Sequence, residues 1–173
     1  MKKLYVDIDG VLLTKKQPRK AEGVDTFIDF AISNFQCYWL TTHCKGDSQT
    51  ALNYLTRYFE SSMLNKLTKF KSTTWDALKT DGIDLKSDFY WLDDAPLKYE
   101  VNYLKSINKS DRLIIVNLEN QNELERIKSQ LPTASIKYRA VLWFAAVRFL
   151  QPLFFPVERK SLRKALHFML ANR

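Results

Sequence analysis

KLYVDIDGV, residues 3–11, begins as a short apolar strand and ends in a turn. The run over 3–8 is typical of a buried strand, and Asp9-Gly10 breaks it off. Asp7 and Asp9 therefore fall at the carboxyl end of this strand. Their side chains are expected to point to the same side, because side chains of an extended chain alternate with a period of two. The pattern predicts paired carboxylates at one edge of a sheet.

After this strand, short apolar runs typical of strands alternate with segments whose apolar residues repeat at helical spacing. Such alternation predicts parallel strands joined by right-handed crossovers, and so an α/β fold: a three-layer αβα sandwich with a Rossmann-like parallel sheet. Asp47 is expected to cap one helix and Pro96 to open another. The further strands are predicted over 37–41, 88–92 and 112–117, and helices over 24–35, 51–59, 97–104, 124–131 and within 60–80.

Polar residues end two more of the predicted strands. Thr41 and Thr42 follow the second strand, and Asp93-Asp94 follows the third. In open parallel sheets, functional sites lie beyond the carboxyl ends of the strands. We therefore expect these side chains to meet Asp7 and Asp9 at one edge.

Length and charge divide the chain into a body and an extension. The 173 residues suit a catalytic domain over 1–133, followed by a C-terminal extension over 134–173. The extension holds eight of the 27 basic residues and one of the 19 acidic residues, and so carries +7 of the +8 net charge. The start of the chain lacks the pattern of a secretory signal, and two cysteines without zinc spacing fit the cytoplasm.

Four elements in order resemble the haloacid dehalogenase superfamily of hydrolases. Asp7-Ile8-Asp9-Gly10-Val11 is similar to its first motif, Thr41 to its second, Lys79 to its third and Asp93-Asp94 to its acidic fourth. The resemblance covers roughly residues 1–131. It implies the superfamily's fold and a phosphatase activity, with the backbone carbonyl of Asp9 as a metal ligand. Lys71 and Lys86 are alternatives to Lys79 on sequence grounds.

Chemistry gives each of these residues a role. The Asp7 carboxylate can attack phosphorus to form an aspartyl-phosphate, while Asp9 serves as general acid and then base. Thr41, Thr42 and Lys79 are the expected phosphate-binding residues, with Lys79 offsetting negative charge that develops in the transition state. Thr41 and Lys79 complete the predicted catalytic set.

Several acids beside one phosphate require a cation. Mg²⁺ is the expected cofactor, because it prefers hard oxygen ligands and bridges carboxylates to phosphate. Asp7, Asp9, Asp93 and Asp94 form the predicted metal site. The sequence leaves open which of the last two binds directly.

The gaps between the motifs leave no room for a large cap domain. A short flap over 12–20 (LLTKKQPRK) and one helix fill the first gap, so the chain resembles the minimal, capless type. An open site favours a bulky phosphorylated substrate or closure by a second subunit in a homo-oligomer. The flap's lysines and arginine could attract a polyanion, although a solvated basic loop is the alternative.

The sequence does not decide the role of the extension or choose between several alternative functions. Residues 140–157 are apolar but interrupted by Arg148 and two prolines, and a basic amphipathic stripe follows. Residues 140–173 could pack on the body, contact a partner, or lie on a membrane surface. The rivals to a Mg²⁺-dependent phosphatase are a catalytically weak scaffold that binds nucleic acid, a membrane surface or a protein through this extension, and a phosphoryl-transferring mutase.

Overall fold

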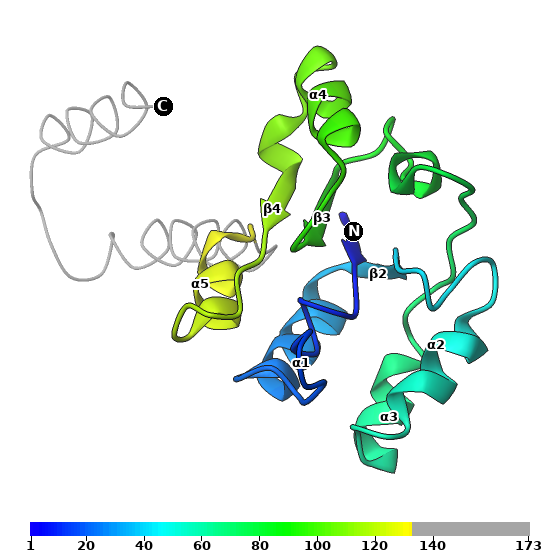
Figure 1. Cartoon of the computed structure of the whole chain (residues 1–173), viewed down its shortest axis with the longest axis vertical. Helices are drawn as coiled ribbons and strands as arrows, with labels where there is room; N and C mark the ends of the chain where they lie inside the picture. Colours follow the sequence, from blue (N-terminus) through cyan, green and yellow to red (C-terminus); the bar gives the residue numbers. More distant parts are fainter. Residues whose placement is uncertain (133–173) are drawn as a thin grey trace, which may run out of the picture. The chain divides into compact units, whose positions relative to one another are not determined.

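The computed structural model describes residues 1–132, and within them four strands form one parallel sheet. The predicted extension, with its apolar and amphipathic segments, lies outside the described residues. None of the helices within residues 1–132 has the length and apolar character needed to cross a bilayer. The strands are β1 (Lys3–Val6), β2 (Gln36–Trp39), β3 (Phe89–Asp93) and β4 (Leu113–Ile115), in the spatial order β2-β1-β3-β4 (Figure 1).

β1 is a central strand because both of its faces are apolar. Leu4 and Val6 are fully buried in one cluster, and Tyr5 is buried in another on the opposite face. Val6 lies between Trp39 of β2 and Leu92 of β3 in the parallel register. Continuous apolar sequence is typical of a strand covered on both sides. This register aligns the carboxyl ends of β1, β2 and β3.

Helices cover both faces of the sheet (Figure 1). Buried residues of α1 (Val24–Asn34) and α5 (Glu123–Gln130) join the cluster that holds Leu4 and Val6. Leu104 of α4 (Lys98–Ser106) joins the cluster on the Tyr5 face. The predicted α/β class and parallel sheet are confirmed, and the arrangement is compatible with a Rossmann-like sandwich. The other helices are α2 (Ser48–Leu55), α3 (Ser61–Leu67) and the short 3₁₀ helices η1 (Lys79–Gly82) and η2 (Ser110–Arg112).

Several element ends differ from those that the sequence predicts. β2 ends at Trp39 instead of Thr41, because the chain bends after Leu40, whose N–H still donates to the Val6 carbonyl at 3.0 Å. α4 begins at Lys98, two residues after Pro96. β4 is shorter than predicted. The helix predicted over 51–59 ends at Leu55.

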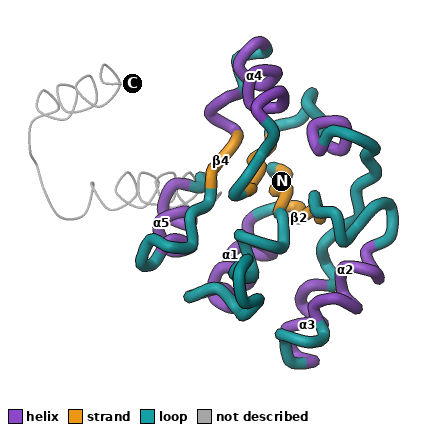
Figure 2. The backbone as a smooth tube through the Cα atoms, in the orientation of Figure 1, coloured by secondary structure: helices purple, strands orange, loops and turns teal. Residues whose placement is uncertain are grey.

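The connection from α3 to β3 is largely irregular (Figure 2). It runs over residues 68–88 and contains only the single turn η1. Lys79, the first residue of η1, is thereby delivered by a loop. Backbone contacts hold this loop near the sheet: the Trp39 N–H donates to the Lys71 carbonyl at 2.9 Å, and the Lys71 N–H donates to the Cys37 carbonyl at 3.0 Å.

A buried carboxylate orders the loop after β4. Glu123 is 3% exposed, and its oxygens accept the Asn117 N–H at 3.0 Å and two N–H groups of Arg126 at 2.6 and 2.8 Å. Asn120 Nδ2 donates a further hydrogen bond at 3.2 Å. The Arg126 guanidinium and these N–H donors lower the pKa of Glu123 to about 2. Its charge therefore fixes the segment over 116–122 to the start of α5.

We expect Glu123→Gln to lower the free energy of unfolding by about 2 kcal/mol at pH 7, because an amide cannot satisfy the same donors. The folded-state pKa is lowered, so the stabilisation is complete above the ordinary glutamate pKa of 4.5 and is lost as pH falls toward about 2. Urea unfolding at several pH values measures the difference in the free energy of unfolding between wild type and variant. Glu125→Gln, at a glutamate whose side chain is 65% exposed, is the control. A difference that stays constant down to pH 2 would contradict this account.

Candidate active site

Asp7 occupies the first position after β1. Its N–H donates to the Leu92 carbonyl of β3 at 3.1 Å, which extends the sheet pairing by one residue. One carboxylate oxygen, Oδ1, accepts the N–H of Ile8 at 2.7 Å. The side chain is mostly buried, and its other oxygen, Oδ2, contacts Lys79 Nζ.

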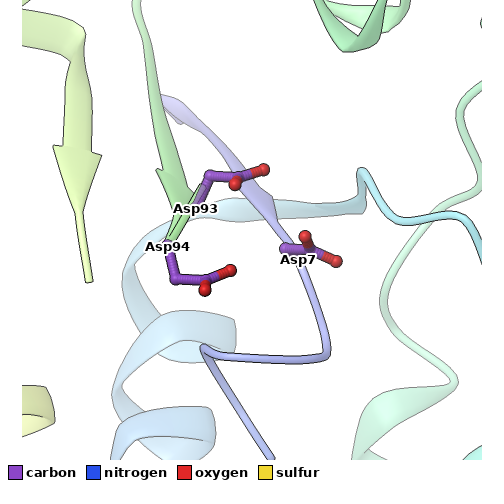
Figure 3. A group of neighbouring side chains, drawn as sticks. All are labelled: Asp7, Asp93 and Asp94. Carbon is purple, nitrogen blue, oxygen red and sulfur yellow. The ribbon is translucent and has the colours of Figure 1, made fainter. Parts of the chain in front are cut away.

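Three carboxylates from two neighbouring strands converge here (Figure 3). Asp93 is the last residue of β3 and Asp94 follows it, and each of the three acids offers an oxygen within 4.8 Å of the others. Asp93 is 1% exposed, and its Oδ1 accepts the Ala95 N–H at 2.9 Å. The prediction that Asp93-Asp94 lies beside the tip of the first strand is therefore confirmed in its geometry.

Lys79 bridges two of these acids. Its Nζ lies 2.5 Å from Asp7 Oδ2 and 2.6 Å from Asp93 Oδ2. Burial alone would lower the pKa of this ammonium, but the attraction of Asp7 and Asp93 outweighs it and raises the pKa above 10.5. Lys79 is therefore a permanent positive charge. Of the three lysines that the sequence offered, this is the one beside Asp7; Lys71 lies over the Tyr38 ring and Lys86 is exposed.

Glu100 positions the loop that carries Lys79. This glutamate of α4 is 1% exposed, and it accepts the Thr80 N–H at 3.2 Å and the Leu97 N–H at 2.9 Å. One carboxylate thus ties η1 to the start of α4, directly after the Asp93-Asp94 pair. The same contact explains why α4 begins at Lys98, since Glu100 satisfies an N–H that precedes the helix.

The pKa of Asp7 reflects its burial and its charged neighbours. Burial raises the pKa of the Asp7 carboxyl, the neighbouring Asp93 adds to the rise, and the Lys79 ammonium opposes it. Lys15 in the flap supplies a second cation, with its Nζ 2.5 Å from Asp94 Oδ2. Two lysines thus face three acids, and one negative charge of the cluster is not offset by them.

Gly10 allows the Asp94 carboxylate to pack against the backbone. Its φ of +82° lies in the left-handed region, and a Cβ at this position would meet the Asp94 Cγ at 2.3 Å. No side chain fits there without displacing Asp94. The glycine of the first motif is therefore required both by the turn and by the acid cluster.

The side chain of Asp9 has different partners from the three clustered acids. Its Oδ2 lies 2.8 Å from Nε2 of His43, and its Oδ1 accepts a hydrogen bond from the Tyr54 hydroxyl at 3.0 Å. The two rings stack, with centroids 3.8 Å apart. Burial and the Asp9 carboxylate raise the pKa of Tyr54, so the phenol remains a donor. Within residues 1–132, the Asp9 carboxylate is outside the acid cluster, and the metal ligand that the resemblance implies for this residue is its backbone carbonyl.

The two threonines of the predicted site differ in exposure. Thr41 is fully buried at the bend after β2, and its hydroxyl accepts the His43 N–H at 3.4 Å. Thr42 is exposed. Neither residue has a hydrogen bond to Asp7, Asp93 or Asp94 in the described part of the chain.

The cluster has the donor chemistry for a hard divalent cation. Oxygen ligands on opposite sides of one Mg²⁺ lie about 4.2 Å apart, twice the metal–oxygen distance, so a small inward movement of the carboxylates suffices. The unbalanced negative charge of the cluster favours such an ion. Asp7, Asp93 and Asp94 are the residues that could hold it.

Sequence reasoning missed several contributors to this site. Tyr54 and Glu100 lie on helices beside the apolar stripes, and nothing in the local pattern separates them from solvated polar positions. His43 also contributes to the site, because its ring contacts Asp9. The sequence marks Lys15 only as part of a basic flap, whereas the structure pairs it with Asp94. A signal existed for His43 alone, because it follows the two threonines at a strand end.

We expect Gly10→Ala to destabilise the fold by more than about 1 kcal/mol and to weaken divalent cation binding, since the methyl group must displace Asp94. Gly23→Ala is a matched control: it shares a positive φ, +73°, but its Cβ would meet only Thr26 Oγ1, at 3.9 Å. Urea unfolding and calorimetric titration with Mg²⁺ give the two readouts. Equal losses in both variants would show that backbone strain alone matters.

Comparisons with family models, with curated proteins and with solved structures give no match to this chain.

Proposed function

We propose that this protein is a Mg²⁺-dependent phosphomonoesterase of the haloacid dehalogenase type, acting through an aspartyl-phosphate at Asp7. The observation that supports it is the meeting of three carboxylates from the ends of β1 and β3, with Lys79 between two of them. A binding scaffold needs no such arrangement, because burying like charges together destabilises a fold. The order of the four sequence motifs supports the same proposal.

In the first step, an oxygen of the Asp7 carboxylate attacks phosphorus and forms the acyl-phosphate bond as the ester P–O bond breaks. Asp9 donates its proton to the leaving oxygen, which departs as an alcohol. The second step returns both residues to their starting state. Asp9 takes a proton from water, the water oxygen attacks phosphorus, and the Asp7–phosphate bond breaks to release inorganic phosphate.

His43 and Tyr54 fit this scheme as positioning residues for Asp9. Each contacts one of its two oxygens, so the carboxyl group is oriented while remaining partly exposed. Partial exposure suits a group that must exchange a proton with both a leaving group and water. The separation of Asp9 from the acid cluster keeps its chemistry distinct from that of Asp7.

Mg²⁺ would be held by Asp7, Asp93 and Asp94, with the Asp9 backbone carbonyl added by the family resemblance. When bound, the ion supplies charge neutralisation between the carboxylates and the phosphoryl oxygens. Lys79 contributes a fixed positive charge at the Asp7 oxygen, which stabilises negative charge that develops on the transferred group. Thr41 and Thr42 are proposed to complete the phosphate site through hydroxyl and backbone N–H groups.

We expect Asp7→Asn to reduce Mg²⁺-dependent hydrolysis of p-nitrophenyl phosphate to the background rate, because an amide cannot form the intermediate. Asp111→Asn, at an aspartate whose side chain is 68% exposed on η2, should retain full activity. Rates with and without Mg²⁺ are compared for all three proteins, with melting temperatures as a check on folding. A wild-type rate that Asp7→Asn leaves intact would rule out the proposed nucleophile.

Tyr54→Phe should lower kcat about tenfold with little change in KM, since Asp9 loses one of the two contacts that orient its carboxyl group. Tyr103→Phe, on α4, is the matched control and should behave as wild type. The melting temperature separates positioning from packing, because a packing defect would lower the stability of the variant as well as kcat, whereas loss of the Asp9 contact should lower kcat alone. An unchanged kcat would remove Tyr54 from the mechanism.

A further inference from the structure

The flap after the first motif is a fixed hairpin. The Thr14 N–H donates to the Arg19 carbonyl at 3.0 Å, and the Ala21 N–H donates to the Leu12 carbonyl at 2.9 Å. The Thr14 hydroxyl closes the tip by donating to the Gln17 carbonyl at 2.7 Å. Leu12 and its neighbour Leu13 are fully buried in the core. The base of this segment is anchored by buried apolar side chains, and its tip is closed by hydrogen bonds. The segment therefore has a defined position, which a solvated loop would lack.

The basic side chains of the hairpin have different partners. Lys15 pairs with Asp94 of the acid cluster, and Lys20 pairs with Asp25 at 2.6 Å. Lys16 and Arg19 are exposed, and neither forms a salt bridge with any residue of 1–132. Two cations are therefore presented at the tip of a fixed hairpin whose neighbouring lysine touches the proposed metal site.

A cleft of about 430 Å³ joins this tip to the acid cluster. Gly10 and Asp94 line it, as do the hairpin residues Lys15, Lys16 and Arg19. Residues 116–119, in the loop held by Glu123, also line it. The volume is that of a small-ligand site. Because Asp94 belongs to both the cleft and the acid cluster, a phosphate ester at Asp7 has the cleft beside it.

We infer that this cleft binds a part of the substrate remote from the reacting phosphate, and that this part carries a second phosphate group, which Lys16 and Arg19 recognise. The inference rests on the proposed function for the position of the reacting phosphate. A guanidinium and an ammonium on one surface suit a phosphate, which accepts charge-assisted hydrogen bonds from both. The acidic lining residue Glu119 disfavours an anion on its side of the cleft and leaves the hairpin side for the phosphate.

Two kinds of substrate carry a second phosphate group: a small bisphosphate and a nucleic-acid end that is phosphorylated. One nucleoside provides matched probes for both: thymidine 3′,5′-bisphosphate, the 3′- and 5′-monophosphates, and a thymidine trinucleotide phosphorylated at both ends. Calorimetric titration of the full chain in Mg²⁺ measures each affinity. The Asp7→Asn variant is used throughout, so that no ester is consumed.

We expect thymidine 3′,5′-bisphosphate to bind at least about tenfold more tightly than either monophosphate, and Lys16→Ala with Arg19→Ala to abolish that preference. Lys86→Ala with Lys105→Ala removes the same charge from exposed residues outside the cleft and should keep the preference. The side chains of Lys16 and Arg19 form none of the hairpin's hydrogen bonds, so this double variant should fold, as circular dichroism can verify.

The measured affinities decide the inference. A preference for the small bisphosphate supports it with a free metabolite as the source, whereas a preference confined to the trinucleotide supports it with a nucleic-acid end as the source. Equal affinities for all probes, or a preference that survives Lys16→Ala with Arg19→Ala, would overturn it. Failure of the phosphatase proposal is seen separately, as absence of wild-type hydrolysis of p-nitrophenyl phosphate, which carries no second phosphate.

Discussion

The close approach of Asp7, Asp93 and Asp94 is the constraint around which the described part of the chain is organised. Carboxylates held within 4.8 Å repel one another, and burial makes each charge more costly. Lys79 offsets part of this cost by contacting two of the acids, and its raised pKa keeps it charged. A fold that retains such a cluster gives up stability at this edge, as functional sites commonly do.

The supporting structure is built from buried groups outside the cluster. Glu100 fixes the loop of Lys79 to α4, and Gly10 leaves the space that the Asp94 carboxylate occupies. Glu123 orders the loop over 116–122, which lines the cleft beside the cluster. Each contact joins a loop to a helix or strand. The sheet sets where the acids emerge, and these loop contacts set how they are oriented.

The roles proposed for Asp7 and Asp9 are consistent with their different partners. Asp7 shares Lys79 with Asp93, while Asp9 is held by His43 and Tyr54. The two aspartates of one short motif thus occupy different electrostatic surroundings, although they are two residues apart. Such a separation is what a nucleophile and a general acid need. The basic hairpin that follows them adds a cation to the cluster and two to the adjoining cleft.

Much of the sheet could be predicted from the sequence, because β1 and β3 are continuous apolar runs that end in acids. Parallel pairing then requires the strand ends to meet, and so the convergence of Asp7 with Asp93-Asp94 followed from pattern alone. The placement of Lys79 depended on family resemblance, since a loop delivers it and no period marks it. Glu100, Tyr54 and the Asp9 partners could not be predicted, because their roles arise from contacts between segments far apart in the chain. Element ends such as that of β2 depend on similar long-range hydrogen bonds.

The most direct test of the account is a crystal structure of the protein with Mg²⁺ and BeF₃⁻, which mimics a phosphoryl group on a carboxylate. The account predicts beryllium bonded to an Asp7 oxygen, with the metal ion bound by Asp7 and at least one of Asp93 and Asp94. BeF₃⁻ bound at a different residue, or a metal ion that leaves all three acids without contact, would contradict it.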